Sequence, residues 1–131
     1  MPKKTIPKPA EFDYQLDRVF HEKARLGIMT CLMSQPEGLS FSDLKEQCGL
    51  SDGNLNRHLE VLSESGFLDT EKSGAGRGSK TNYRLSPCGR KAFDNYLEEL
   101  ERVLAIAQKA AIRHEKTILS RGRARNGLLQ R

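Results

Sequence analysis

The sequence lacks any apolar run long enough to cross a bilayer. Its first residues, MPKKTIPKPAEF, carry charge, and no apolar segment follows them, so this stretch does not have the pattern of a secretory signal peptide. We therefore expect a cytoplasmic protein with no membrane partner.

Cysteine is scarce, because only Cys31, Cys48 and Cys88 occur and they form no CxxC pair. Three scattered cysteines give no disulfide framework. We expect them to be small apolar filler in a reducing compartment rather than groups for metal or redox chemistry.

Catalytic motifs are missing as well. No HExxH, GxSxG or Walker-type phosphate loop occurs, and GAGRG is not followed by a helix start. The histidines His21, His58 and His114 are far apart in the sequence. We expect that the protein is not an enzyme and needs no cofactor or metal.

The 131 residues, 37% of them hydrophobic, suffice for one domain with one modest core. The net charge of +5 is uneven, because residues 1–9 and 121–131 together hold seven cations and no anion. The interior therefore has 15 basic and 17 acidic residues, a charge of −2. Within it, KSGAGRGSKTNYR has four cations and no anion, which suits phosphate contact at one face.

Residues Ser40 to Leu68 predict two short helices joined by a tight turn. Ser40 is a candidate cap with Asp43 as its capping-box partner, and Gly49 ends the first helix. Ser51 caps the second, whose apolar stripe is Leu55, Leu59 and Leu62 and which ends at Gly66. This is the pattern of a helix-turn-helix.

The side of the second helix opposite its leucines is small, amide-bearing and cationic. Asparagine can form a paired hydrogen bond with adenine and arginine with guanine, and glycine near a helix start lets the backbone approach phosphates. His58 either donates to a phosphate or lies partly buried at the edge of the leucine stripe. The candidate DNA-contacting residues of this helix are Ser51, Asp52, Gly53, Asn54, Asn56, Arg57 and His58.

Before this motif, residues 1–10 contain three prolines and are expected to be a mobile tail. Phe12, Leu16, Val19 and Phe20 predict a first amphipathic helix. A second apolar series, from Leu26 to Met33, predicts another helix that ends before Pro36.

After Gly66, FLDTEKS, GAGRG and TNYRLS predict a two-stranded hairpin with a flexible tip, the wing. Its candidate DNA contacts are Lys72, Arg77, Lys80 and Arg84. In the alternative interpretation, the glycines only serve the tight turn and the cations are merely solvated.

Ser86 and Pro87 predict the start of a long helix that runs to about Leu119. Apolar residues alternate at steps of four and three along it, as in a coiled-coil seam. His114 on this seam either tunes a dimer with pH or binds a ligand, or is merely tolerated there. Residues 120–131 are basic and are expected to be disordered. The predicted dimer interface is Phe93, Leu97, Leu100, Leu104, Ala107 and Ala111.

Three stretches, LDRVFHEKARLGIMTCLM, LSDGNLNRHLEVLSESGFL and GAGRGSKTNYRLSPCGRKAF, resemble winged-helix transcriptional regulators of the MarR and ArsR superfamily. The resemblance covers about Leu16 to Leu104. It implies a helix in the major groove, a wing tip at the minor groove or backbone, and a dimerising last helix. The cysteine-rich stretch of metal-sensing relatives is absent, so we do not expect metal sensing.

We therefore expect a mainly α (α+β) winged helix-turn-helix with a two-stranded wing. Its domains are a tail at 1–10, a DNA-binding domain at 11–86, a dimerisation helix at 87–119 and a basic tail at 120–131. The expected function is sequence-specific binding of double-stranded DNA, as a homodimeric repressor on an inverted repeat. The alternatives are a protein–protein interaction module, or a regulator with a small-molecule effector pocket near the dimer helices.

Overall fold

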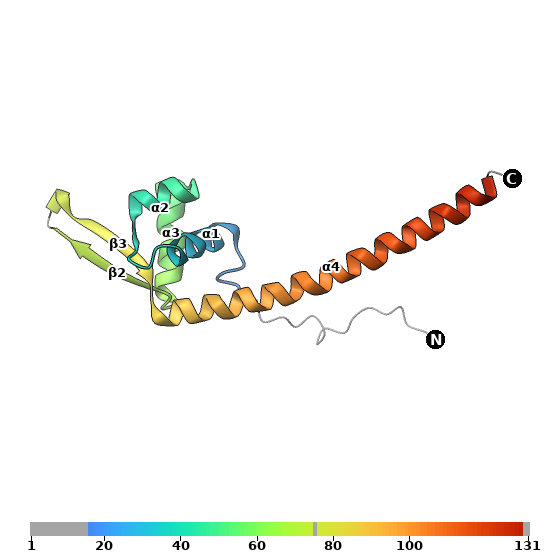
Figure 1. Ribbon diagram of the computed structural model, residues 1–131. Helices are drawn as coiled ribbons and strands as arrows, with labels where there is room; N and C mark the ends of the chain where they lie inside the picture. Colours follow the sequence, from blue (N-terminus) through green and yellow to red (C-terminus); the bar gives the residue numbers. More distant parts are fainter. Residues whose placement is uncertain (1–15, 75, 130–131) are drawn as a thin grey trace. The chain divides into compact units, whose positions relative to one another are not determined.

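The computed structural model describes residues 16–74 and 76–129, and for residues 77 and 123–129 only the backbone (Figure 1). Gln15–Leu97 forms one compact unit, and the chain from Glu98 belongs to a second one. None of the described helices combines the length and apolar character that a bilayer crossing needs. The elements are α1 (Lys23–Met33), β1 (Leu39–Ser40), α2 (Phe41–Cys48), α3 (Asp52–Glu64), β2 (Leu68–Ser73), the short 3-10 helix η2 (Gly76–Gly78), β3 (Lys80–Leu85) and α4 (Pro87–Leu129).

The capping residues predicted for α2 and α3 are confirmed. The Ser40 hydroxyl accepts the Asp43 N–H at 3.1 Å, and the Asp43 carboxylate accepts the Ser40 N–H at 3.4 Å. Gly49 ends α2 with φ 63°, and Ser51 accepts the Asn54 N–H at 3.2 Å. These caps satisfy N–H groups that have no partner within either helix.

The sheet is antiparallel with the strand order β1-β3-β2, so the predicted two-stranded wing is joined by a third strand. Leu39 pairs with Tyr83 and Ser40 with Asn82. A two-residue strand carries no alternating pattern, which is why the sequence does not reveal it. The Asn82 amide also donates to the Glu37 carbonyl at 2.9 Å, which fixes the chain that leads into β1.

The predicted helix around Phe12 to Phe20 is wrong for its described part. Phe12 lies outside the described residues, whereas Asp17 to Phe20 form a turn before α1. The Asp17 carboxylate accepts the Val19 N–H at 2.9 Å, and its carbonyl accepts the N–H groups of Phe20 and His21. Aspartate favours such local bonds over a helix. The second helix, α1, confirms its prediction.

The core of the compact unit combines aliphatic residues of α1, α2 and α3 with an aromatic cluster. Phe20 lies 4.8 Å from Phe67, 5.3 Å from Phe93 and 5.6 Å from Tyr96, measured between ring centroids. Such contacts add stability beyond the burial of apolar area. The aliphatic members are Ile28, Met29, Leu32, Leu44, Leu55, Leu59 and Leu62.

The start of α4 is fastened to the turn after α3. The buried Ser86 hydroxyl donates to the Gly66 carbonyl at 2.6 Å and accepts the Gly89 N–H at 2.9 Å. A Cβ at Gly89 would collide with the Phe67 carbonyl, so only glycine fits there. The contact positions Phe93 and Tyr96 in the core.

Two expectations for α4 are corrected. It ends at Leu129 rather than near Leu119, because the basic stretch is proline-free and rich in arginine, a good helix former, and Gly122 and Gly127 cost only about 1 kcal/mol each. Phe93 is 1% exposed and contacts Phe20 and Tyr96, so it belongs to its own core and not to a dimer interface.

Candidate nucleic-acid interface

Helix α3 is held to the core by one side and exposes the other. Leu55, Leu59 and Leu62 are at most 2% exposed. Burying three leucines contributes several kcal/mol, at about 1.5–3 kcal/mol each, so the orientation of the helix is well defined. The exposed residues at its start and along its outer side are Ser51, Asp52, Gly53, Asn54, Asn56 and Arg57.

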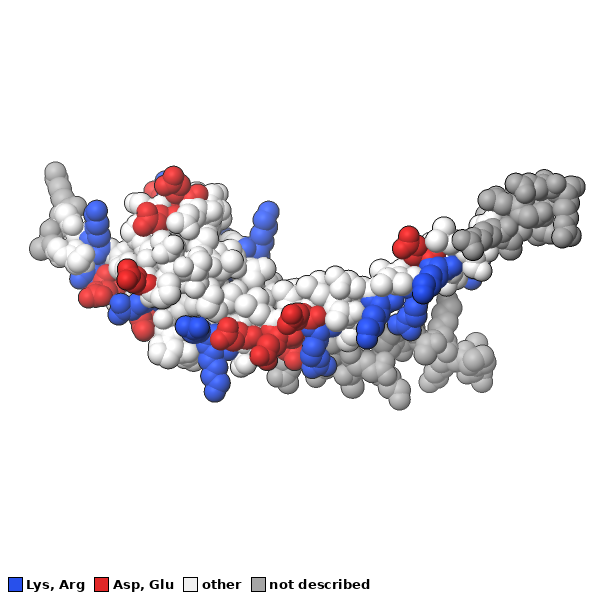
Figure 2. All heavy atoms as spheres, in the orientation of Figure 1, with Lys and Arg blue, Asp and Glu red and all other residues white. Residues whose placement is uncertain are grey.

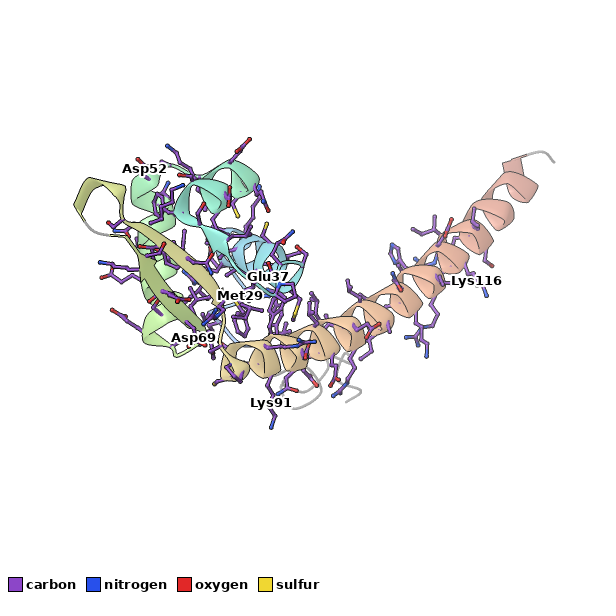
Figure 3. The ribbon with its side chains drawn as sticks, turned by 60° about the vertical axis from the view of Figure 1, so that its left-hand side comes forward. Met29, Glu37, Asp52, Asp69, Lys91 and Lys116 are labelled. Atoms are coloured by element: carbon purple, nitrogen blue, oxygen red, sulfur yellow. The ribbon has the colours of Figure 1, made fainter. Side chains whose placement is uncertain are left out.

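Asp52 and Arg57 make different use of this exposed side. Asp52 lies at the start of α3 (Figure 3). Its carboxylate pairs with Lys45 of α2 at 2.9 Å, an exposed ion pair that links the two helices. Because the pair is exposed, it contributes little stability. The Arg57 guanidinium is 3.5 Å from the Asn54 amide oxygen, at the limit of a hydrogen bond. A binding partner could therefore displace the weak contact between Arg57 and Asn54.

His58 does not lie on the outer side. It is 7% exposed, and its Nδ1 is 3.2 Å from an Arg25 guanidinium nitrogen and 3.8 Å from the Glu22 carboxylate. A phosphate contact is therefore wrong for His58 in this conformation. The alternative, a histidine at the edge of the leucine stripe, describes its position.

The neutral form of His58 fits this environment. Nδ1 cannot both accept from Arg25 and donate to Glu22, and the Arg25 contact is the shorter one. Burial lowers the pKa of His58, outweighing the nearby Glu22 carboxylate, which raises it, while Arg25 and Arg57 lower it further. Glu22 accepts the Arg25 N–H at 2.9 Å, and this bond holds the pKa of its carboxyl below its usual range.

The wing carries its cations on exposed strand positions. Lys72 on β2 and Lys80 on β3 are exposed, whereas Arg84 lies 3.7 Å from the Glu71 carboxylate on the neighbouring strand. The backbone of Arg77 lies in η2 at the wing tip, and its side chain is outside the described part of the chain. Lys72 and Lys80 are thus the better-placed cations among the side chains that are described.

A cleft beside β3 is lined by residues of both the wing and α2. Its volume is about 570 Å³, and it is lined by Ser40, Phe41, Ser42, Asp43, Ser79, Lys80, Thr81 and Tyr83. Lys80 was predicted as a contact, but the hydroxyls of Ser42 and Thr81 beside it were not. The only sequence signal for such a contact was Ser42 in the first turn of α2, and a serine at this position is too common to indicate a DNA contact.

Charges of both signs are mixed on the face that Figure 2 shows. Figure 2 shows Lys and Arg side chains beside Asp and Glu side chains on the face in view, both at the wing and along α4. This face of the folded body is therefore not uniformly basic, in agreement with the slightly negative charge of the chain's interior.

Among residues 16–74 and 76–129, no group of three or more His, Cys, Asp or Glu side chains could hold a metal ion.

Residues 24–104 match a protein family described as the winged helix DNA-binding domain. The chain belongs to this family. The order of helix-turn-helix, wing and long helix agrees with the assignment, and the protein is a winged-helix DNA-binding transcriptional regulator, not an enzyme.

Two relatives in sequence support the assignment. The chain is 39% identical over 83 residues to an uncharacterised protein of Methanocaldococcus jannaschii, covering 63% of this chain and 89% of that protein. It is 37% identical over 73 residues to the arsenical resistance operon repressor of Escherichia coli K12. That match covers 56% of this chain and 58% of the repressor.

Solved structures give the same fold. A transcriptional regulator homologue from Pyrococcus horikoshii OT3 superposes with a TM-score of 0.66 at 26% identity, over 75% of this chain and 96% of that one. A MarR-family regulator from Silicibacter pomeroyi has a TM-score of 0.53 at 19% identity, over 64% of this chain and 55% of that one, which shows likeness of fold alone.

Proposed function

We propose that the protein is a homodimeric repressor that reads an inverted repeat in double-stranded DNA. The observation that carries the proposal is the exposed set Asn54, Asn56 and Arg57 on a helix whose other side is buried. Repression is supported by the similar arsenical resistance operon repressor, and occlusion of a promoter needs no chemistry beyond binding.

In this proposal, α3 lies in the major groove. Asn54 and Asn56 can bond adenine edges and Arg57 a guanine edge, because amide and guanidinium groups match the paired acceptors and donors of those bases. Ser51, Asp52 and Gly53 stand at the helix start, where backbone N–H groups approach phosphates. His58 lies on the buried side of α3, where its Nδ1 accepts a hydrogen bond from Arg25 and so links α3 to α1.

The wing contributes contacts that do not depend on sequence. Lys72, Arg77 and Lys80 neutralise phosphates or enter the minor groove, with Ser42 and Thr81 as hydroxyl donors beside Lys80. Arg84 adds less, because Glu71 already faces it at 3.7 Å. The wing therefore sets affinity and salt dependence, and α3 sets base preference.

The dimer is proposed for α4 beyond its buried start. Leu97 is 39%, Leu104 50% and Ile118 54% exposed, and with Leu100, Ala107 and Ala111 they follow coiled-coil spacing. An exposed stripe of this length needs a partner, and the same helix of a second copy supplies the same spacing. A two-fold dimer would present two α3 helices to two half-sites about one helical turn apart.

The Arg57→Ala variant tests base reading. Duplexes bound by the wild type are first selected from a random pool, and affinities for the selected and an unselected duplex are then compared. Loss of a guanine contact should weaken binding to the selected duplex by about 1–3 kcal/mol and leave the unselected duplex nearly unchanged.

The matched control is Lys91→Ala, which removes an exposed cation from α4. Figure 3 shows Lys91 and Asp52 at opposite sides of the compact unit. This variant should keep the discrimination between duplexes. Equal losses on both duplexes for Arg57→Ala would refute base reading. A wild type that retains no duplex from the pool would instead favour a protein–protein interaction module.

A further inference from the structure

Two of the three cysteines meet where α1 packs against the first helix of the helix-turn-helix. Cys31 lies on α1 and Cys48 is the last residue of α2, and their sulfur atoms are 3.9 Å apart. Both side chains are half-buried, whereas Cys88 is exposed on α4. Residues 17 positions apart are thus in sulfur–sulfur contact, although the sequence predicted only apolar filler.

Small molecules can reach this thiol pair. A cleft of about 430 Å³ is lined by Glu22, Lys23, Ala24, Gly27, Cys31, Gln47, Cys48, Gly49 and Leu50. Gly27, one turn before Cys31, has open space where a side chain would lie. The pair is therefore accessible to a small reagent, unlike a pair sealed in the core.

We propose that Cys31 and Cys48 are a modification site that forms a reversible disulfide between α1 and α2 under oxidising conditions. A disulfide bond is about 2.05 Å long, so the sulfurs must approach by about 1.9 Å. Cys48 is at the end of α2, directly before Gly49 with φ 63°, where the helix already stops. The approach therefore need not distort the middle of a helix.

The oxidant is a low-molecular-weight disulfide such as oxidised glutathione. The Cys31 thiolate attacks one of its sulfurs, a Cys31–glutathione bond forms, and one glutathione thiolate leaves. Cys48 then gives its proton to water and attacks the Cys31 sulfur, which releases the second glutathione thiolate. The two protein thiols lose two electrons, and one glutathione disulfide gains them.

The order of the two steps follows from burial. Burial raises the pKa of the Cys48 thiol to about 11, with further contributions from the charge and hydrogen bond of Cys31. Cys48 is therefore a poor first nucleophile at neutral pH. Once Cys31 is a neutral mixed disulfide, its charge no longer opposes ionisation of Cys48, and the second step becomes easier.

The bond would staple the first helix of the helix-turn-helix to α1. A cross-link that closes a loop of this length should raise the Tm of a domain by on the order of 10 °C. In a reducing cytoplasm such a bond is oxidant-dependent rather than permanent. This inference does not depend on the proposed operator or dimer.

The 131-residue chain with Cys88→Ser is oxidised with glutathione disulfide, digested without reduction and mapped by mass spectrometry. We expect a Cys31–Cys48 linked peptide, the loss of two hydrogens from the intact monomer, the rise in Tm, and reversal by reduced glutathione. The matched variants Cys31→Ser and Cys48→Ser, both in the Cys88→Ser background, should show neither the linked peptide nor the rise in Tm.

Two results would overturn the inference. One is a folded protein in which Cys31 and Cys48 stay reduced, or keep only a glutathione adduct, after prolonged oxidation. The other is a linked peptide accompanied by a lower Tm, since the bond would then not fit the native arrangement of α1 and α2.

Discussion

Arg57 and His58 are neighbours in the sequence but lie in opposite environments on α3. Arg57 is exposed and weakly held by Asn54, whereas His58 is buried beside Arg25 and Glu22. The 100° step between successive helical residues carries the chain from the outer side to the core edge in one position. One residue is thus available to DNA, and the other fixes the helix that presents it.

The burial of His58 predicts a pH-dependent stability. Its pKa is lowered from 6.5 in the folded protein, so the folded state holds fewer protons there than the unfolded chain. The stabilisation from neutral His58 is present above pH 6.5 and is lost as the pH falls through the lowered pKa. Urea unfolding between about pH 8 and about pH 5 should therefore show a decline that His58→Gln reduces. A variant that declines as steeply as the wild type would contradict this account.

At the residue level, the sequence predicted what depends on helical spacing and did not predict what depends on distant neighbours. The exposure of Asn56 and Arg57 follows from the leucine stripe alone. The burial of His58 depends on Arg25 and Glu22, more than thirty positions earlier, and the burial of Phe93 depends on Phe20. Periodicity within one helix contains no information about either.

At the scale of elements, the wing is joined to the helix-turn-helix through β1. Because β1 pairs with β3 and leads directly into α2, the base of the wing is connected to the first helix of the motif. The Asn82 bond to the Glu37 carbonyl strengthens the same junction. The cleft that contains Lys80, Ser42 and Thr81 is a product of this arrangement.

The wing cations should control the salt dependence of DNA binding. Replacing Arg77 and Lys80 by alanine should lower the slope of log affinity against log salt by about two units per bound protomer, since each phosphate contact contributes about 0.9. The measurement is a salt titration of binding to the selected duplex. The control is the Arg90→Ala, Lys91→Ala pair on α4, which removes the same charge from exposed positions.

An unchanged slope with a folded variant would mean that the wing is only a structural hairpin.

The sequence predicted both wing strands and both caps of the motif, because turn and cap residues act locally. It did not reveal β1 or the turn at Asp17. The two-residue strand β1 forms because β3 lies beside it, and the turn at Asp17 depends on a single side-chain hydrogen bond. Neither feature leaves a repeating pattern in the sequence.

At the scale of the whole molecule, the ends of the chain carry the excess positive charge and the interior is slightly acidic. The folded body therefore does not attract polyanions in general. In the proposed function, discrimination between DNA sequences depends on α3. In the helix from Glu98 to Gly122, Glu99, Leu100 and Val103 are half-buried and all other residues are exposed. This exposure, on coiled-coil spacing, is what a second copy would cover.

The central claim is that α4 makes a two-fold dimer that reads both halves of an inverted repeat. Its most direct test is sedimentation of the wild type and of a Leu100→Asp, Leu104→Asp variant, alone and with the selected duplex. The account predicts a wild-type dimer at micromolar concentration. It predicts a folded monomeric variant whose affinity for the repeat is lower by a factor of roughly 100 or more, because the two α3 helices are no longer linked.

The control variant, Ala105→Asp with Ser120→Asp, adds the same charges at exposed positions away from the stripe and should stay dimeric. A monomeric wild type at micromolar concentration would contradict the account. So would a Leu100→Asp, Leu104→Asp variant that remains dimeric and binds the repeat with wild-type affinity.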